Sequence, residues 1–145
     1  MVKVNTTKIV IAGVVYATVA QTIHIIGTIL TMGFYLDPVY FKVWSKIMMP
    51  EAGSPPASFF YYAITFGVVT GILLAYVYSL VREGVPGKGI MKGVNYGAIL
   101  YLAAGLPMTM TLYLLINLPA MLILDWSLEA LVIYLVNGII FARLI

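Results

Sequence analysis

The sequence predicts an all-α fold, a bundle of four helices that cross a membrane. Three long runs contain no Asp, Glu, Lys or Arg: residues 9–36, 52–81 and 93–124. Each run exceeds the about 20 apolar residues that a helix needs to cross a bilayer. A fourth, shorter run covers residues 130–142. The chain of 145 residues is 63% hydrophobic, and its mean hydropathy is +1.06. These observations indicate an integral membrane protein with a single transmembrane domain, residues 1–145.

We expect the four spans at about residues 9–36, 57–81, 93–115 and 128–145. Backbone polar groups in lipid need hydrogen bonds within their own segment, so each span is predicted to be α-helical. The fourth span is short, but Arg143 lies near its end and can extend its guanidinium to the membrane interface.

A short helix is predicted at residues 38–49, after the first span. Asp37 and Pro38 form a typical helix start, with the carboxylate as N-cap and proline at the first helical position. Lys42, Ser45 and Lys46 follow at helical spacing on one face, among apolar and aromatic residues. This pattern favours a helix lying in the membrane interface. The alternative is an ordinary loop with aromatic residues at the interface.

The positive charges predict the orientation. If the N-terminus lies inside, the cytoplasmic side has six Lys and Arg residues and the outer side has two. The inner residues are Lys3, Lys8, Arg82, Lys88, Lys92 and Arg143, and the outer ones are Lys42 and Lys46. We therefore expect a multi-pass protein of the cell membrane with both termini in the cytoplasm.

The two halves of the chain resemble each other. Residues 13–17 (GVVYA) match residues 93–97 (GVNYG), and residues 69–75 (VTGILLA) match residues 136–142 (VNGIIFA). Each half would form one helical hairpin, and the two hairpins would be parallel. The sequence thus predicts an internal repeat with a pseudo-two-fold axis along the membrane normal, unlike the inverted repeats of many transporters.

Small residues at helical spacing predict how the helices pack. Such residues let backbones approach closely, which drives helix association in lipid. The predicted packing residues are Gly13, Ala17, Ala63, Gly67, Gly71, Ala75, Gly93, Gly97, Gly138 and Ala142. We expect these contacts within one chain, because four helices offer enough partners. Contacts between two copies, or with a partner membrane subunit, are the alternative.

The best candidate for a binding site is a polar stripe on the first span. Its members, at spacings of three and four residues, share one helical face: Gln21, His24, Thr28, Thr31 and Tyr35. Asn137 on the fourth span is a possible partner. An ionisable residue such as His24 inside a membrane indicates a functional site by default. The alternative is that His24 is neutral and only holds two helices together.

The composition excludes several kinds of site. The chain has no cysteine and a single histidine, so thiolate, multi-histidine and haem sites are excluded within one protomer. We therefore expect no metal and no cofactor. We also expect no nucleic-acid partner, because no basic patch is interleaved with aromatic residues. Asp125 and Glu129 are four residues apart, on one helix face near the predicted outer start of the fourth span. Such a pair could bind a cation, but it is more often simply solvated.

The chain has a glycine-rich first span, a Gly-xxx-Gly pattern in the second span and a short basic turn between residues 82 and 92. In these features it resembles the uncharacterised four-span membrane proteins of bacteria and archaea. The resemblance implies a four-helix fold without an established activity, and it assigns no catalytic residue.

Three functions fit the sequence. The first is a non-enzymatic bundle that binds or passes a small or lipidic ligand along the polar stripe, with membrane lipids as its surroundings. The second is a structural or accessory subunit whose glycines face partner helices. The third is a membrane enzyme that acts on lipid through Asp37, Asp125 or Glu129. No nucleophile has an evident base, so catalysis is the least expected.

Overall fold

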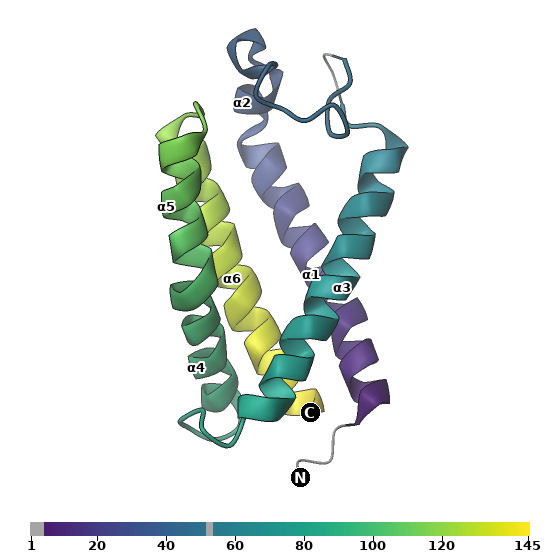
Figure 1. The fold of residues 1–145 in the computed structure, drawn as a ribbon, viewed down its shortest axis with the longest axis vertical. Helices are drawn as coiled ribbons and strands as arrows, with labels where there is room; N and C mark the ends of the chain where they lie inside the picture. Colours follow the sequence, from purple (N-terminus) through teal and green to yellow (C-terminus); the bar gives the residue numbers. More distant parts are fainter. Residues whose placement is uncertain (1–4, 52–53) are drawn as a thin grey trace.

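The computed structural model shows an all-helical bundle and describes residues 5–51 and 54–145 (Figure 1). Four segments are long and apolar enough to cross a bilayer: α1 (Thr6–Leu30), α3 (Ala57–Val81), Ile90–Leu115 and α6 (Ala120–Leu144). The third consists of α4 (Ile90–Leu100), the π-helical turn η2 (Tyr101–Gly105) and α5 (Leu106–Leu115). No strand occurs in the described residues. The predicted all-α fold with four candidate membrane spans is confirmed.

Successive spans run in opposite directions (Figure 1). One end of the bundle holds the start of α1, the turn between α3 and α4, and the end of α6; we call it the turn end. The other end holds α2 (Met32–Leu36), η1 (Pro38–Tyr40) and the segment that leads to α3; we call it the loop end. The two ends differ in how tightly the helices pack.

Three of the four predicted spans are close to the observed helices. α3 has the predicted bounds, and the third span begins at Ile90 instead of residue 93. α1 begins at Thr6, because the Asn5 side chain accepts a hydrogen bond from the Lys8 backbone N–H at 3.2 Å and caps the helix. The first span is not one helix to residue 36, since Thr31 leaves helical geometry and α2 is a separate short helix.

The predicted start of the fourth span at residue 128 is wrong. α6 begins at Ala120, with extended Pro119 immediately before it. The prediction treated Asp125 and Glu129 as the border of the span, because charge is costly in lipid. In the structure both carboxylates lie within α6, and the Glu129 side chain is only 7% exposed.

The predicted helix at residues 38–49 is also not formed. Only Pro38–Tyr40 is helical, as a single 3₁₀ turn, and separate turns follow. Local hydrogen bonds explain this, since Asp37 Oδ1 accepts from Val39 N at 3.0 Å and Ser45 Oγ accepts from Met48 N at 3.1 Å. Side chains that bond nearby backbone in this way compete with a continuous helix.

Small residues bring the spans together within the chain. A Cβ built on Gly71 would lie 2.7 Å from Gly13 O, and one on Gly93 would lie 2.5 Å from Gly138 O. Both positions therefore require glycine, because a methyl group would collide with backbone. Gly67 likewise faces Ala17, Gly97 faces Tyr134, Ala75 is fully buried, and Ala142 is half-buried against the core.

The glycine contacts follow the predicted repeat. Gly13 meets Gly71 between α1 and α3, and their sequence counterparts Gly93 and Gly138 meet between α4 and α6. The contact of Ala17 with Gly67 likewise corresponds to that of Gly97 with Tyr134. These contacts have the pattern that a duplication predicts, and the duplication itself stays a prediction. The superposition of the two hairpins about the membrane normal stays a prediction.

The turn end holds the tightest part of the core. Tyr16, Tyr78, Tyr96 and Phe141 come from four different helices and are all buried. The rings of Tyr78 and Tyr96 pack edge to face, with centroids 4.9 Å apart. The Tyr96 hydroxyl donates to Leu74 O at 2.8 Å, so its polar group is satisfied. This aromatic cluster fixes the helices at the turn end, whereas α1 and α3 diverge toward the loop end (Figure 1).

Candidate ligand cavity

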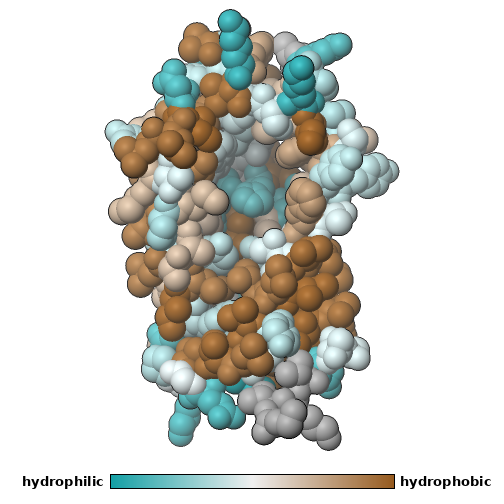
Figure 2. Space-filling view, in the orientation of Figure 1, coloured by the Kyte–Doolittle hydropathy of each residue, from teal (hydrophilic) through white to brown (hydrophobic). Residues whose placement is uncertain are grey.

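A cavity of about 620 Å³ lies where α1 and α3 diverge. It is lined by α1, α2, α3 and α6 and by the segment that precedes α3, and most lining residues are apolar or aromatic. Figure 2 shows a hollow on the side of the bundle, with hydrophilic atoms inside it and apolar atoms around much of its edge. The volume is within the range of about 300–1,000 Å³ that is typical of small-molecule sites.

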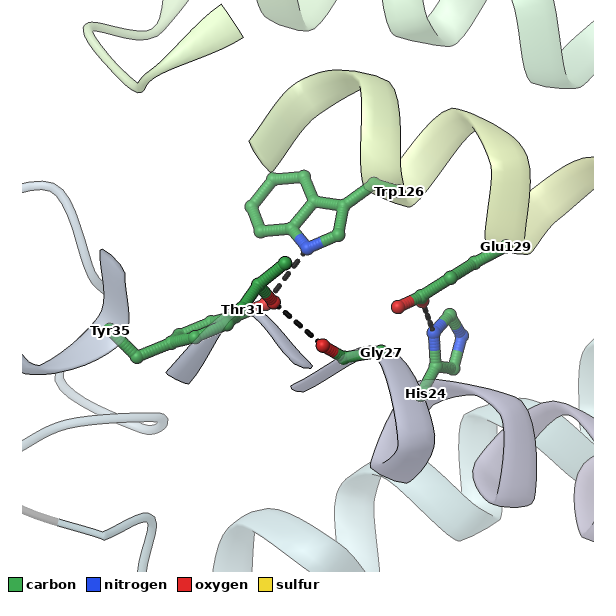
Figure 3. A network of polar contacts seen from close by, with 6 residues as sticks. All are labelled: His24, Gly27, Thr31, Tyr35, Trp126 and Glu129. Atoms are coloured by element: carbon green, nitrogen blue, oxygen red, sulfur yellow. Dashed lines mark hydrogen bonds and ion pairs between the residues drawn. The ribbon is translucent and has the colours of Figure 1, made fainter. Parts of the chain in front are cut away.

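Two ionisable side chains meet at the wall of this cavity. His24 Nδ1 on α1 contacts Glu129 Oε2 on α6 (Figure 3). The Glu129 side chain is 7% exposed, whereas that of His24 is 53% exposed. The carboxylate is therefore buried between the helices, and the more exposed imidazole lies beside it in the cavity wall.

Gly27 makes room for the Glu129 carboxylate. A Cβ built on Gly27 would lie 2.6 Å from Glu129 Cδ and still closer to Oε1. The carboxylate thus lies directly against the α1 backbone, a position that no side chain at residue 27 would allow. Gly27 is itself buried and lies three residues after His24. One turn of α1 provides both the partner of Glu129 and the space for it.

Further hydrogen bonds fix the rim of the cavity next to this pair. Trp126 Nε1 on α6 donates to the Tyr35 hydroxyl on α2 at 2.8 Å (Figure 3). Thr31 Oγ1 donates to Gly27 O at 2.7 Å. The Tyr35 ring also stacks on Trp44, with centroids 5.0 Å apart. These contacts hold α2 and the following segment against α6, which closes the cavity toward the loop end.

The predicted polar stripe largely coincides with the cavity wall. Gln21, His24, Thr28 and Tyr35 all line it. Thr31 does not, since its hydroxyl is bonded to the α1 backbone. Asn137 is wrongly placed in the predicted site, because it lies two turns from Glu129 in the buried part of α6, where its Nδ2 donates to Ile133 O at 2.9 Å.

One residue that was predicted for helix packing, Ala63, lies in the cavity wall on α3. Its predicted packing role stays a prediction. α1 and α3 are in close contact at Gly13 and Gly71, nearer the turn end. From there toward the loop end the two helices diverge.

The sequence analysis did not connect Glu129 or Trp126 with the polar stripe. Glu129 was placed at the outer border because α6 was predicted to start too late. The signal that could have found them is Pro119, since a proline just before a long apolar segment is typical of a helix start. A helix from residue 120 places Glu129 about two and a half turns inside the span.

The cavity region carries more acid than base. Asp125 is one turn from Glu129 on α6, and its Oδ2 is buried without a hydrogen-bond partner among the described residues. The lining residues include Glu129 and His24, but no Lys or Arg. No group of three or more His, Asp or Glu side chains in the described chain is arranged to hold a metal ion.

Known proteins give no direct guide to the function. No protein family, curated protein or solved structure matches this chain. The resemblance to four-span membrane proteins therefore stays a prediction, and any function has to be inferred from the cavity and its residues.

Proposed function

We propose that this polytopic membrane protein binds a small amphipathic or lipidic ligand in the cavity between α1, α3 and α6, without catalysing a reaction. The observation that carries the proposal is the cavity of about 620 Å³ with a mostly apolar wall and one contact between ionisable side chains, His24 with Glu129. Binding sites for small molecules commonly combine an apolar wall with a few polar groups that orient the ligand.

The position of the opening indicates the route of access. The hollow opens on the side of the bundle, between helices whose outward surfaces are apolar (Figure 2). In a bilayer this side faces lipid. A ligand would therefore enter from the membrane, with its apolar part along α1 and α3 and its polar part at His24 and Glu129. The cavity has room for one drug-sized molecule or part of a lipid chain.

The small residues weigh against the alternative of an accessory subunit. Gly13, Gly71, Gly93 and Gly138 all face other helices of the same chain. These close contacts are used within the protomer and are not available to a partner helix. The cavity, by contrast, is open and has no occupant within the described chain, which favours ligand binding.

Filling the cavity should prevent ligand binding. We expect Ala63→Phe to reduce labelling of the cavity several-fold, because the new ring would occupy part of a space of about 620 Å³. The probe is a neutral long-chain alcohol with a diazirine group, added to liposomes that contain the protein. Cross-linked sites are mapped by mass spectrometry. The unsubstituted protein should be labelled preferentially at Ile25, Met32 and Phe59, which line the cavity.

The matched control is Ala103→Phe. Ala103 is exposed on η2 and lies outside the cavity, so the same added ring should leave the labelling unchanged. Labelling spread evenly over lipid-facing residues such as Leu114 and Leu115 would contradict the proposed binding site.

We also infer that the turn end lies in the cytoplasm. It carries Arg82, Lys88 and Lys92, and positive residues favour the inner side. In intact cells, a membrane-impermeant thiol reagent should label Lys46→Cys at the loop end and leave Lys88→Cys unlabelled until the membrane is opened. The opposite pattern would reverse the orientation.

A further inference from the structure

The buried carboxylate of Glu129 needs a positive partner. A charged group with only 7% of its side chain exposed loses most of its hydration, and in a membrane protein water is scarce around it. Two ionisable side chains lie next to it: the imidazole of His24, which contacts it, and the carboxyl of Asp125 one turn earlier on α6. A proton on the imidazole would neutralise the carboxylate.

The surroundings of the pair would favour a cation over an anion. In the cavity wall, α1 contributes His24, α2 contributes Tyr35 and α6 contributes Glu129. Asp125 lies one turn before Glu129 on α6, outside the lining. The described lining residues of α3 and the segment before it carry no titratable group: Met48, Ser54, Pro55, Phe59, Phe60 and Ala63. Two carboxyl groups, one phenol and one imidazole face this region, so acids outnumber bases. An anion would find no Lys or Arg in the wall.

We propose that the ligand is an amphipathic cation with a single positive charge, and that its binding at Glu129 releases the proton held by the His24–Glu129 pair. This inference rests on the proposed function and names the ligand class for the same cavity. His24 is 53% exposed on the cavity side, so the ligand's charged group can replace it next to the carboxylate. The apolar wall then holds the rest of the molecule.

The exchange is balanced in charge and atoms. In the empty cavity an imidazolium and a carboxylate face each other. When the cation binds the carboxylate, the Nδ1–H bond of His24 breaks, its electron pair stays on nitrogen, and the proton leaves to water. One positive charge replaces another, so the buried carboxylate stays neutralised throughout. Cation and proton thus compete for one negative site.

Two ions of nearly equal shape and opposite charge test the preference for a cation and its exchange with a proton. Tetraphenylphosphonium and tetraphenylborate are titrated into the purified protein in a non-ionic detergent, and a pH-sensitive dye in weak buffer reports proton release. We expect the phosphonium ion to bind with release of about one proton per protein. Its affinity should rise about tenfold per pH unit over the range in which the pair is protonated. Tetraphenylborate should bind at least about tenfold more weakly, since the wall has no Lys or Arg and the imidazolium is already paired with Glu129.

Glu129→Gln removes the charge and keeps the shape. This variant should lose the preference for the cation and the proton release, while the neutral diazirine alcohol still labels the cavity. The control is Glu83→Gln, the same change at an exposed residue of the turn end, which should behave as the unsubstituted protein. If Glu129→Gln does not fold, the two ions and the proton release in the unsubstituted protein decide the question alone.

The outcomes separate the two proposals. Equal binding of both ions, or cation binding without proton release, overturns the exchange, while cavity labelling by the neutral probe would keep the proposed function. Absence of cavity labelling by the neutral probe overturns the proposed function itself.

Discussion

Replacing Gly138 by leucine is expected to lower the free energy of unfolding by about 3 kcal/mol, the upper end of the usual cost of overpacking. A Cβ at this position would lie 2.9 Å from Gly97 N and even closer to Gly93 O. Both neighbours are backbone atoms of α4, so they cannot rotate away as a side chain could. The helices would have to separate along a contact that also buries Phe141 and Tyr96.

Unfolding of the purified protein in mixed micelles, followed by circular dichroism, measures the effect. Gly138→Ala should cost less, because it adds only the Cβ, and it keeps the test valid if the leucine variant does not fold. Gly33→Leu is the matched control, since nothing lies within 4 Å of a Cβ there. Similar stability of the Gly138 and Gly33 variants would contradict the observed packing.

Sequence patterns could predict the fold where one physical factor dominates. α3 has the predicted bounds because its whole length is apolar and Pro56 precedes it, so hydropathy and helix start agree. The paired glycines were predicted for a similar reason, since close helix contacts in lipid require small residues at regular spacing.

The same patterns do not predict features that depend on contacts between residues far apart in the sequence. A charge inside a span is costly only if nothing neutralises it, and the contact between Glu129 and His24 joins residues far apart in the sequence. The spacing of Gln21, His24 and Thr28 on one helical face was enough to predict that they line a common site. It could not show that the partner of His24 is an acid, because that depends on where α6 begins.

The second large effect is expected at the His24–Glu129 pair. His24→Leu should destabilise the protein by about 3 kcal/mol, because removing one partner leaves the other charge buried without compensation. Glu129 is only 7% exposed, so little water reaches its carboxylate in this position. The same unfolding assay in mixed micelles measures the loss.

A second substitution distinguishes charge from packing. Adding Glu129→Gln to His24→Leu removes the uncompensated carboxylate and keeps the volume at residue 129, so much of the lost stability should return. The coupling energy of the double-mutant cycle would then be clearly different from zero, as for residues in direct contact. Additive effects of the two substitutions would mean that His24 contributes only by filling space. In that case the buried carboxylate would be neutralised without His24, and the competition between a proton on this pair and a cationic ligand would lose its physical basis.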